Sequence, residues 1–280
     1  MYKTIFIDVD GTLRNSKGEI TPRTISSIRQ ITDTGMKVIL TSGRSRTHML
    51  ALSKACGASC FVISSNGADV YDSGVDQVIY QDKMEKEDII YLYELAERQK
   101  AHFTMCSGFD RVCNRVERFD GSEKALGESI EMFVHQNIVN QCIIGNAPRE
   151  VIQQIKAQIE QEKSSVKIIN QSPGILDNKV PLNGCYYLDI VNRITSKGNA
   201  IMEFCRNNFI DIDETIGIGD SQNDVSMFKV VGESVAMGNA SPEIQRLTNR
   251  IIPSNDQEGV AVYLEELLDR YHQGEFFRQY

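Results

Sequence analysis

The sequence predicts an α/β fold in which a parallel sheet is split by an inserted α+β unit. Short apolar runs alternate with segments of helical spacing over residues 2–67, and the same alternation returns from about residue 195. Between these two stretches the alternation breaks down, near residue 82. One sheet built from both ends of the chain explains this order better than two domains in series.

The first part of the predicted core contains three strands and two helices. Its first helix places Ile25, Ile28 and Ile31 at helical spacing, and Gly35 follows as a stop signal. Its strands are rich in apolar and β-branched residues, which is typical of buried strands. The predicted strands are residues 2–8, 36–43 and 60–67, and the predicted helices are residues 22–34 and 45–56.

The middle of the chain predicts the inserted α+β unit. We expect it to span residues 82–189, which leaves 1–81 and 190–280 to the core. Paired short strands are predicted within residues 101–118. The remaining predictions for this unit are helices at 85–100, 122–136 and 148–163 and strands at 139–145, 165–170 and 184–191.

The last part of the chain returns to the core pattern. Ser196 is the predicted N-cap of a helix over residues 196–208. A strand and a helix follow it, and the chain closes on further helical segments. The predictions are a strand at 214–220, a helix that begins within 221–231, a short strand and turn at 233–240, and helices at 242–249 and 259–271.

Charge and hydropathy exclude several classes of protein. The net charge is -8, which argues against broad nucleic-acid binding and against attachment to anionic membranes. No apolar run reaches about 18 residues, and the start of the chain lacks the pattern of a signal peptide. These features predict a cytoplasmic protein.

The cysteines and histidines do not form a recognisable ligand pattern along the chain. The seven cysteines include no CxxC pair, so we interpret them as small buried thiols in a reducing compartment. The four histidines, which we interpret as structural or surface residues, are His48, His102, His135 and His272.

Two carboxylates follow the first predicted strand, in the run DVDGT that begins at Asp8. Asp8 closes the strand at the end where open α/β sheets place their sites. Asp8 and Asp10 repel each other unless a cation or a shared proton lies between them. The pair predicts a nucleophile and an acid/base with a divalent ion, although a strand end followed by an Asx turn gives the same pattern.

A second acidic strand end begins at Asp220, in the run GDSQND. Asp220 and Asp224 are spaced i, i+4 and can point the same way. Oxygen ligands with few protein carboxylates suit Mg²⁺, which keeps several of its waters. Capping of the following helix would also favour Asp and Asn at these positions.

Further polar residues predict a phosphate-binding set. Ser42, Gly43 and Arg44 follow the second strand, where a hydroxyl and the free amides of a helix start can cradle phosphate. Lys197 opens a helix after the inserted unit, and its charge could neutralise both phosphate and nucleophile. Asn66 follows the third strand, where contact with substrate competes with a plain Asn-Gly turn.

These segments are predicted to meet, because the carboxyl ends of parallel strands lie at one edge of a sheet. Each residue alone has an ordinary explanation, such as helix capping or a solvated surface lysine. Taken together, they predict one site that binds both phosphate and metal.

The motifs resemble those of the haloacid dehalogenase (HAD) superfamily of phosphohydrolases, almost end to end over the core. DVDGT is similar to its first motif, TSGR to its second, SKG to its third and GDSQND to its fourth. SNGA, AMGNA and SNDQEGVA resemble the Cof-type, class IIB branch. The resemblance implies a Rossmann-like core with an inserted cap of the C2B type. Arg14 stands where an apolar residue is frequent, and it could affect the choice of substrate.

The resemblance also implies a role for each matched residue. Asp8 would be the nucleophile, and Asp10 would protonate the leaving alkoxide and then activate water. Ser42 and Lys197 would hold the phosphoryl oxygens, and Asp224 would support the metal directly or through water. The implied ligands of Mg²⁺ are Asp8, Asp10 (through its carbonyl), Asp220 and Asp224, and the phosphate- or substrate-binding residues are Ser42, Gly43, Arg44, Asn66, Lys197 and Asn223.

We therefore expect a Mg²⁺-dependent phosphatase that hydrolyses a small phosphorylated metabolite, such as a sugar phosphate, through an aspartyl-phosphate on Asp8. Two alternatives share these residues: a phosphomutase that uses the same intermediate, and a non-catalytic phospho-acceptor domain in which phosphorylated Asp8 persists. No nucleic acid or membrane partner is expected. The sequence does not indicate an oligomeric state or decode the residues of the cap.

Overall fold

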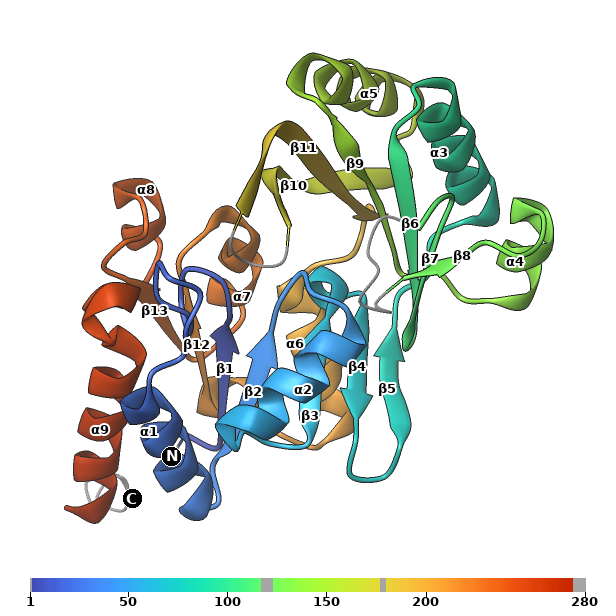
Figure 1. Ribbon diagram of the computed structural model, residues 1–280. Helices are drawn as coiled ribbons and strands as arrows, with labels where there is room; N and C mark the ends of the chain where they lie inside the picture. Colours follow the sequence, from blue (N-terminus) through green and yellow to red (C-terminus); the bar gives the residue numbers. More distant parts are fainter. Residues whose placement is uncertain (1, 117–122, 177–179, 274–280) are drawn as a thin grey trace. The chain divides into compact units, whose positions relative to one another are not determined.

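The structure is a computed structural model that describes residues 2–116, 123–176 and 180–273 and, within these, the side chains outside 170–184. The chain divides into two compact units (Figure 1). The first unit comprises Met1–Arg44, His48–Tyr80 and Ser196–Tyr280, and the second comprises Ser45–Thr47 and Gln81–Thr195.

The first unit is built on an eight-stranded sheet with the order β14-β13-β12-β1-β2-β3-β4-β5. The six strands from β14 to β3 are mutually parallel, and β4 is antiparallel to β3. The predicted α/β fold with a parallel-sheet core is confirmed. The strands are β1 (Thr4–Asp8), β2 (Lys37–Thr41), β3 (Phe61–Ser64), β4 (Asp69–Asp72), β5 (Gln77–Gln81), β12 (Thr215–Gly219), β13 (Glu233–Met237) and β14 (Arg250–Ile252).

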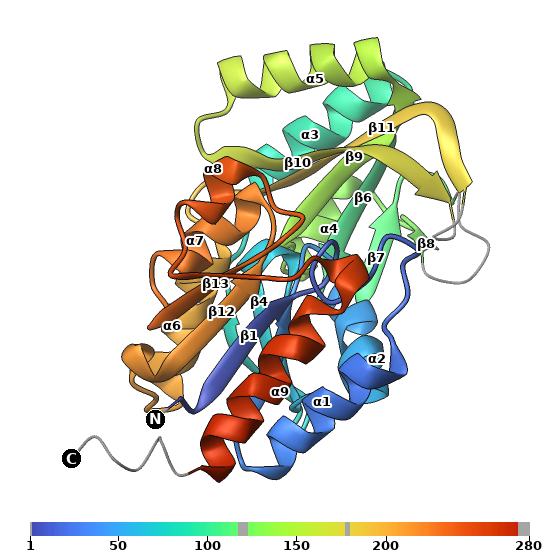
Figure 2. The same ribbon diagram turned by 90° about the vertical axis from the view of Figure 1, so that its left-hand side faces the viewer.

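Helices cover both faces of this sheet (Figure 2). Alternation along the central strand β1 sends Ile5 and Ile7 into the cluster under α1 and α9, and Phe6 into the cluster under α6 and α7. A parallel sheet covered in this way needs apolar residues on both faces, which is why its strands are apolar runs. The helices are α1 (Pro22–Asp33), α2 (Arg46–Cys56), α6 (Lys197–Asn207), α7 (Val225–Phe228), α8 (Pro242–Gln245) and α9 (Gly259–His272).

Side-chain caps fix where two of these helices begin. The hydroxyl of Thr21 accepts from the Thr24 amide, and Pro22 occupies the first turn of α1. Ser196 caps α6 by accepting from the Asn199 amide, as predicted. The cap on α6 matters for the site, because it determines that Lys197 is the first residue of that helix.

The second unit is a six-stranded sheet with the order β10-β11-β9-β6-β7-β8. Helices α3, α4 and α5 pack on one face of it, in a cluster that includes Phe103, Met105 and Ile144. Its strands are β6 (His102–Ser107), β7 (Asp110–Cys113), β8 (Lys124–Ala125), β9 (Gln141–Pro148), β10 (Val166–Leu176) and β11 (Val180–Asn192), and its helices are α3 (Lys86–Arg98), α4 (Ile130–Gln136) and α5 (Arg149–Glu162).

Several sequence-based element predictions need correction. The helix predicted over 122–136 begins only at Ile130, and residues before it form the two-residue strand β8. The helix predicted over 242–249 ends at Gln245. Strands β4, β5 and β14 were not predicted, because they have only three to five residues and lie next to turns. The inserted unit was expected to end at 189, but β11 continues to Asn192 and the unit to Thr195.

None of the described helices combines the length and the hydropathy that a bilayer-spanning segment requires. All seven cysteines are free thiols. Five of them are buried, while Cys60 is exposed and Cys185 is half-buried. The expectation of buried thiols is therefore correct for five of the seven.

We predict that Phe204→Ala destabilises the first unit. Phe204 is fully buried, and its ring makes edge contacts with Phe6 and Phe61 at centroid distances of 5.8 and 5.0 Å. Removing it should lower the free energy of unfolding by about 3–5 kcal/mol, measured by urea denaturation. Phe209, which is 97% exposed, is the matched control, and Phe209→Ala should change stability by less than about 0.5 kcal/mol. Equal effects of the two substitutions would contradict this packing.

Candidate active site

The predicted polar residues follow adjacent parallel strands at one edge of the first sheet. Asp8 ends β1, Ser42 follows β2, Asn66 follows β3 and Asp220 follows β12. These four strands are neighbours in the order β12-β1-β2-β3, so their carboxyl ends meet. Segments that are some two hundred residues apart in sequence thereby reach one place.

A buried lysine joins two of the carboxylates. Nζ of Lys197 lies 2.5 Å from Oδ1 of Asp8 and 2.6 Å from Oδ1 of Asp224. The side chains of Lys197 and Asp224 are fully buried, and that of Asp8 is 6% exposed. Burying one charge of this group alone would cost several kcal/mol, so the three residues must be buried together.

Burial and charge control the protonation of this group. Burial raises the pKa of Asp8 well above its usual range, with Asp224 and Asp220 adding to the rise and Lys197 opposing it. Burial also raises the pKa of Asp220 to about 6, partly offset by a hydrogen bond from Thr12. Burial lowers the pKa of Lys197, but Asp224 and Asp8 outweigh it and the net direction is upward. Lys197 therefore stays charged. The raised pKa values of Asp8 and Asp220 show that their negative charges are not fully compensated, so an added cation would stabilise both carboxylates.

Asp220 is held against the loop that follows β1. The Thr12 hydroxyl donates to Oδ1 of Asp220 at 2.8 Å. Gly11 has a φ of +85°, and a Cβ added to it would lie only 2.4 Å from Oδ2 of Asp220. The glycine of DVDGT therefore permits both the left-handed turn and the close approach of the Asp220 carboxylate.

Asp224 binds through both of its oxygens. Oδ1 accepts from Lys197, while Oδ2 accepts from the backbone amides of Asp220 and Ser221, each at 3.0 Å. Asp224 therefore orients the loop that carries Asp220, and it also contributes a negative charge to the site. Capping of the short helical turn at residues 222–224, which was the ordinary explanation for this residue, is present as well.

Asp10 points to a different partner from Asp8. Its carboxylate receives two hydrogen bonds from Arg44, from Nε and Nη2, both at 2.7 Å. The Asp10 side chain is 53% exposed, and the hydrogen bonding of Arg44 to Asp10 is the main cause of a raised pKa of Arg44. Arg44, predicted to bind phosphate or substrate, thus holds the predicted acid/base in this structure.

The predicted phosphate cradle contains polar atoms with spare capacity. Ser42 is buried, and its Oγ accepts from the Arg44 amide at 3.3 Å, which leaves its hydroxyl proton to donate. Oδ1 of Asn66 accepts from Nδ2 of Asn223 at 3.2 Å. Within the described part of the chain, Nδ2 of Asn66 is buried and has no hydrogen-bond partner. Gly43 lies beside it, since an added Cβ there would lie 2.8 Å from that nitrogen.

Two asparagines that were given no role support the loop after β1. Asn239 donates from Nδ2 to the carbonyl of Gly11 at 2.8 Å, and its Oδ1 accepts from the Asn255 amide at 3.0 Å. Asn255 in turn donates to the carbonyl of Arg14 at 2.8 Å. Both lie in the runs AMGNA and SNDQEGVA, so their motifs were visible in the sequence, whereas their contact with the loop was not.

Three carboxylates can hold a metal ion here. One oxygen from each of Asp8, Asp220 and Asp224 lies within 4.8 Å of the others. This donor set consists only of hard oxygens, which fits Mg²⁺ better than it fits zinc or copper. The carboxylate of Asp10 is not one of the three, so Asp10 could join only through its backbone carbonyl. Asp8 and Asp220, on which the predicted chemistry depends, do meet.

Comparison with known proteins identifies the family of this chain. The family described as haloacid dehalogenase-like hydrolase matches residues 5–264. The phosphatase YwpJ of Bacillus subtilis is 26% identical over 286 residues, which cover 95% of this chain and 100% of YwpJ.

Two solved structures share the fold. A haloacid dehalogenase-like hydrolase from Bacteroides thetaiotaomicron superposes with a TM-score of 0.81 at 24% identity, covering 95% of this chain and 100% of that one. The HAD subclass IIB sugar phosphatase BT4131 superposes with a TM-score of 0.74 at 20% identity, covering 95% and 98%. The resemblance of the motifs to haloacid dehalogenase phosphohydrolases is confirmed by the family model, and the structures confirm the fold.

We predict that Lys197→Met destabilises the protein in a pH-dependent way. Without the ammonium, Asp8 and Asp224 remain buried and unpaired, which should cost about 3–5 kcal/mol at pH 8. The folded-state pKa of Asp8 then rises further above its unfolded value, so the cost is absent at low pH and grows as pH rises through the folded value. Urea denaturation at pH 5 and pH 8 measures the difference.

Lys229→Met is the control for this prediction. Lys229 is exposed and follows α7 in the same unit, so its removal takes away the same charge without uncovering a buried carboxylate. The control should keep wild-type stability within about 0.5 kcal/mol at both pH values. A deficit in Lys197→Met that is equal at pH 5 and pH 8 would show that the buried carboxylates are not its cause.

Proposed function

This chain belongs to the haloacid dehalogenase-like hydrolase family and is a phosphoric monoester hydrolase, and we propose that it works with Mg²⁺ through an aspartyl-phosphate on Asp8. The observation that carries the proposal is the buried Lys197, bound to Asp8 and Asp224 at the carboxyl edge of the sheet. A cation and an anion hidden from water at this edge match a nucleophile that must be kept ionised beside a phosphate.

Asp8 is the nucleophile in this proposal. One of its carboxylate oxygens forms a bond to phosphorus as the bond from phosphorus to the leaving oxygen breaks, in line. Lys197 opposes the rise in the pKa of Asp8 that burial causes and so favours its ionised form, and its ammonium would also face the transferred phosphoryl group. Phosphoryl transfer depends mainly on positioning and on neutralising charge, and a buried ammonium supplies both in a region of low dielectric.

The phosphoryl oxygens are held by donors around the ends of β2 and β3. The hydroxyl of Ser42 and the unpartnered Nδ2 of Asn66 supply two hydrogen bonds. Asn223 fixes the orientation of the Asn66 amide, because its Nδ2 occupies Oδ1 of Asn66. The set therefore presents donors to the phosphate before it arrives, which reduces the cost of ordering them during the reaction.

Asp10 is the acid and base of the two half-reactions. Its protonated carboxyl gives a proton to the leaving alkoxide, and its carboxylate then takes a proton from the water that attacks the aspartyl-phosphate. In this structure Arg44 holds the Asp10 carboxylate by two hydrogen bonds. A phosphate entering the cradle beside Ser42 offers Arg44 a second anion, which would free Asp10 to turn towards the leaving group.

The carboxylates of Asp8, Asp220 and Asp224 would hold Mg²⁺, joined by the carbonyl of Asp10. When bound, Mg²⁺ offsets negative charge on the nucleophile and the phosphate and helps to orient them. Thr12 and the amides of the Asp220 loop keep the ligands in place before binding. The raised pKa of Asp220, about 6, is what a carboxylate cluster without its cation should show.

The substrate class proposed is a small phosphorylated metabolite, such as a sugar phosphate. The support is the class IIB relationship and the sugar phosphatase among the structural neighbours. The net charge of -8 adds that a polyanionic substrate such as a nucleic acid would be repelled over most of the surface.

We predict that Asp8→Asn abolishes turnover of p-nitrophenyl phosphate while leaving the fold intact. An amide cannot attack phosphorus, so kcat should fall by more than about 1,000-fold. Circular dichroism checks the fold, and release of nitrophenolate measures the rate. Asp269→Asn, at an exposed carboxylate on α9, should retain wild-type kcat. Retained activity in Asp8→Asn would overturn the assignment of the nucleophile.

We also predict that stabilisation by Mg²⁺ weakens as pH falls through about 6. Below that value Asp220 takes a proton, and the proton competes with the cation for the same carboxylate. The rise in Tm caused by Mg²⁺ should therefore be large at pH 7.5 and small at pH 5. Asp220→Asn should lose the rise at both pH values, while Asp213→Asn, at an exposed position, should keep it. Equal stabilisation of the wild type at both pH values would refute this.

A further inference from the structure

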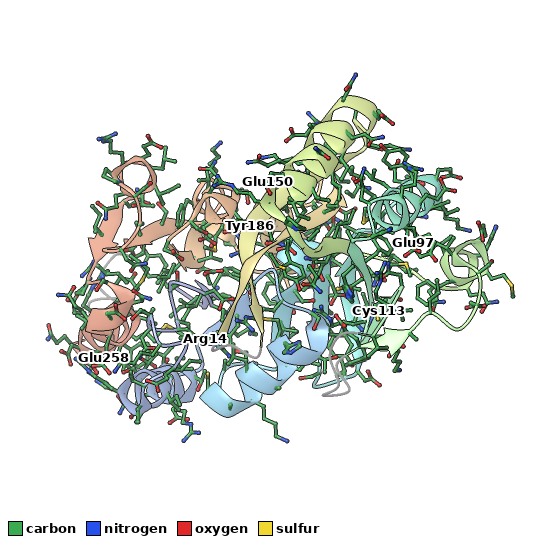
Figure 3. The ribbon with its side chains drawn as sticks, turned by 45° about the horizontal axis from the view of Figure 1, so that its top comes forward. Arg14, Glu97, Cys113, Glu150, Tyr186 and Glu258 are labelled. Atoms are coloured by element: carbon green, nitrogen blue, oxygen red, sulfur yellow. The ribbon has the colours of Figure 1, made fainter. Side chains whose placement is uncertain are left out.

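A second group of side chains that could hold a metal ion lies in the second unit and includes none of the residues of the proposed mechanism. A ring nitrogen of His102, Sγ of Cys113 and a carboxylate oxygen of Glu123 lie within 4.8 Å of one another. All three residues are buried, with exposures of 3%, 0% and 7%. Cys113 is labelled in Figure 3.

The strand register places these residues on one face of the sheet. In the antiparallel pair β6 and β7, Thr104 lies opposite Cys113, and His102 is two residues before Thr104 on the same face. Phe103 and Met105, which alternate with them, belong to the cluster under the helices. His102, Thr104 and Cys113 therefore occupy the other face, where Glu123 reaches them from just before β8.

Glu123 has one carboxylate oxygen without a partner. Its Oε1 accepts from the Thr104 hydroxyl at 3.3 Å and from Nη2 of Arg111 at 3.2 Å. Its Oε2 is buried and meets no hydrogen-bond donor among the described residues. Leaving such an oxygen unsatisfied costs about 1–3 kcal/mol or more, so an additional ligand at this position would relieve a real deficit.

The carboxylate is also ionised, as a metal ligand must be. Burial by itself would raise the pKa of Glu123, but His102 and Arg111 outweigh burial and hold it at about 2. At neutral pH, Glu123 therefore carries a negative charge, and one of its carboxylate oxygens lies within 4.8 Å of ligand atoms of His102 and Cys113.

We propose that His102, Cys113 and Glu123 form a zinc-binding site in the second unit. Sulfur, imidazole nitrogen and a single carboxylate are the donors typical of zinc, whereas Mg²⁺ prefers oxygen alone. Ligand atoms on a tetrahedral zinc lie roughly 3.3–3.8 Å apart, given bonds of about 2.0–2.3 Å. The three atoms need to draw together by about 1 Å, within the reach of small side-chain rotations. Three protein ligands leave the fourth position of the tetrahedron open.

Two neighbouring side chains affect the site. The Thr104 hydroxyl lies 2.8 Å from Nε2 of His102 and donates to Glu123, so it orients two of the ligands at once. Arg111 opposes the metal, because its guanidinium lies beside Glu123 and repels a cation. Arg111→Gln should therefore tighten zinc binding, which is the opposite of the effect expected for a residue that holds the ligands together.

Binding exchanges a proton for the metal. In this structure Sγ of Cys113 donates to the carbonyl of Lys124 at 3.3 Å, so the sulfur is a thiol. On binding, the S–H bond breaks, a sulfur–zinc bond forms and one proton leaves to solvent, with no oxidant or reductant involved. Zinc uptake should accordingly release about one proton per site from Cys113 near neutral pH.

The test uses the full chain, kept reduced and with Mg²⁺ in excess so that the carboxylate site of the first unit is filled. Cobalt(II) is titrated as a spectroscopic substitute for zinc, and zinc stoichiometry is measured by equilibrium dialysis. A thiolate–cobalt charge-transfer band should appear and saturate at one cobalt per chain, and zinc should displace it. Cobalt bound to Asp8, Asp220 and Asp224 has only oxygen ligands and cannot produce this band, so the result does not depend on the proposed function.

Variants assign the band to its ligands. Cys113→Ser should remove the band and weaken zinc binding by more than about 100-fold. This loss exceeds that expected from mutating a residue that only hydrogen-bonds to a ligand. Cys106→Ser, at a buried cysteine of β6 outside the cluster, is the matched control and should keep both. Glu123→Gln should keep the band but weaken zinc binding, which tests the site even if Cys113→Ser folds poorly.

Three results would overturn the proposal. The first is the absence of a thiolate–cobalt band and of bound zinc in the wild type at micromolar metal. The second is loss of the band in Cys106→Ser and its retention in Cys113→Ser. The third is unchanged zinc affinity in Glu123→Gln, which would leave the cluster as a buried ion pair of Glu123 with Arg111 beside His102.

Discussion

The ion pair of Lys197 with Asp8 and Asp224 is the interaction on which the rest of the first unit depends. It joins the end of β1, the start of α6 and the turn after β12, which come from opposite ends of the chain. Water is excluded from all three side chains, so none of them is tolerable without the others. Burial makes these charges expensive to desolvate. It also strengthens their interaction with a bound phosphate, because the dielectric constant of a site without water is low.

The surrounding loops hold these charged side chains in position. Gly11 allows the loop after β1 to turn against Asp220, Thr12 binds that carboxylate, and Asn239 holds the carbonyl of Gly11. Asp224 fixes the next loop through two backbone amides. Most of the polar atoms here are satisfied by neighbours. Among the described residues, Nδ2 of Asn66 has no hydrogen-bond partner, and we assign it to the phosphate.

Much of this arrangement could be predicted from the sequence. Strong apolar runs predicted the central strands. The topology of parallel sheets then predicted, without any distances, that Asp8, Ser42 and Asp220 lie close together. The short strands β4, β5 and β14 were not predicted, because a few residues beside turns carry little periodic signal. The sequence also could not show that Arg44 binds Asp10, since that contact depends on which rotamers the loops allow.

The group of His102, Cys113 and Glu123 was not predicted from the sequence for a related reason. Its members are separated by ten or eleven residues on two strands and a loop, so they form no local spacing of the kind that marks a zinc motif. The antiparallel register of β6 and β7 brings His102 and Cys113 together, and the pairing of β7 with β8 brings Glu123 to them. The interpretation of His102 as a structural or surface residue was drawn from spacing along the chain, which does not detect side chains that meet across strands.

The central claim, that Asp8 carries the phosphoryl group, is tested most directly by trapping the intermediate. The enzyme is mixed with substrate and Mg²⁺, quenched within a turnover and reduced with borohydride, which converts an acyl phosphate of aspartate into homoserine. Peptide mass spectrometry should then find homoserine at position 8, and only when substrate was present. Modification at another carboxylate, or rapid turnover with position 8 unmodified, would contradict the account.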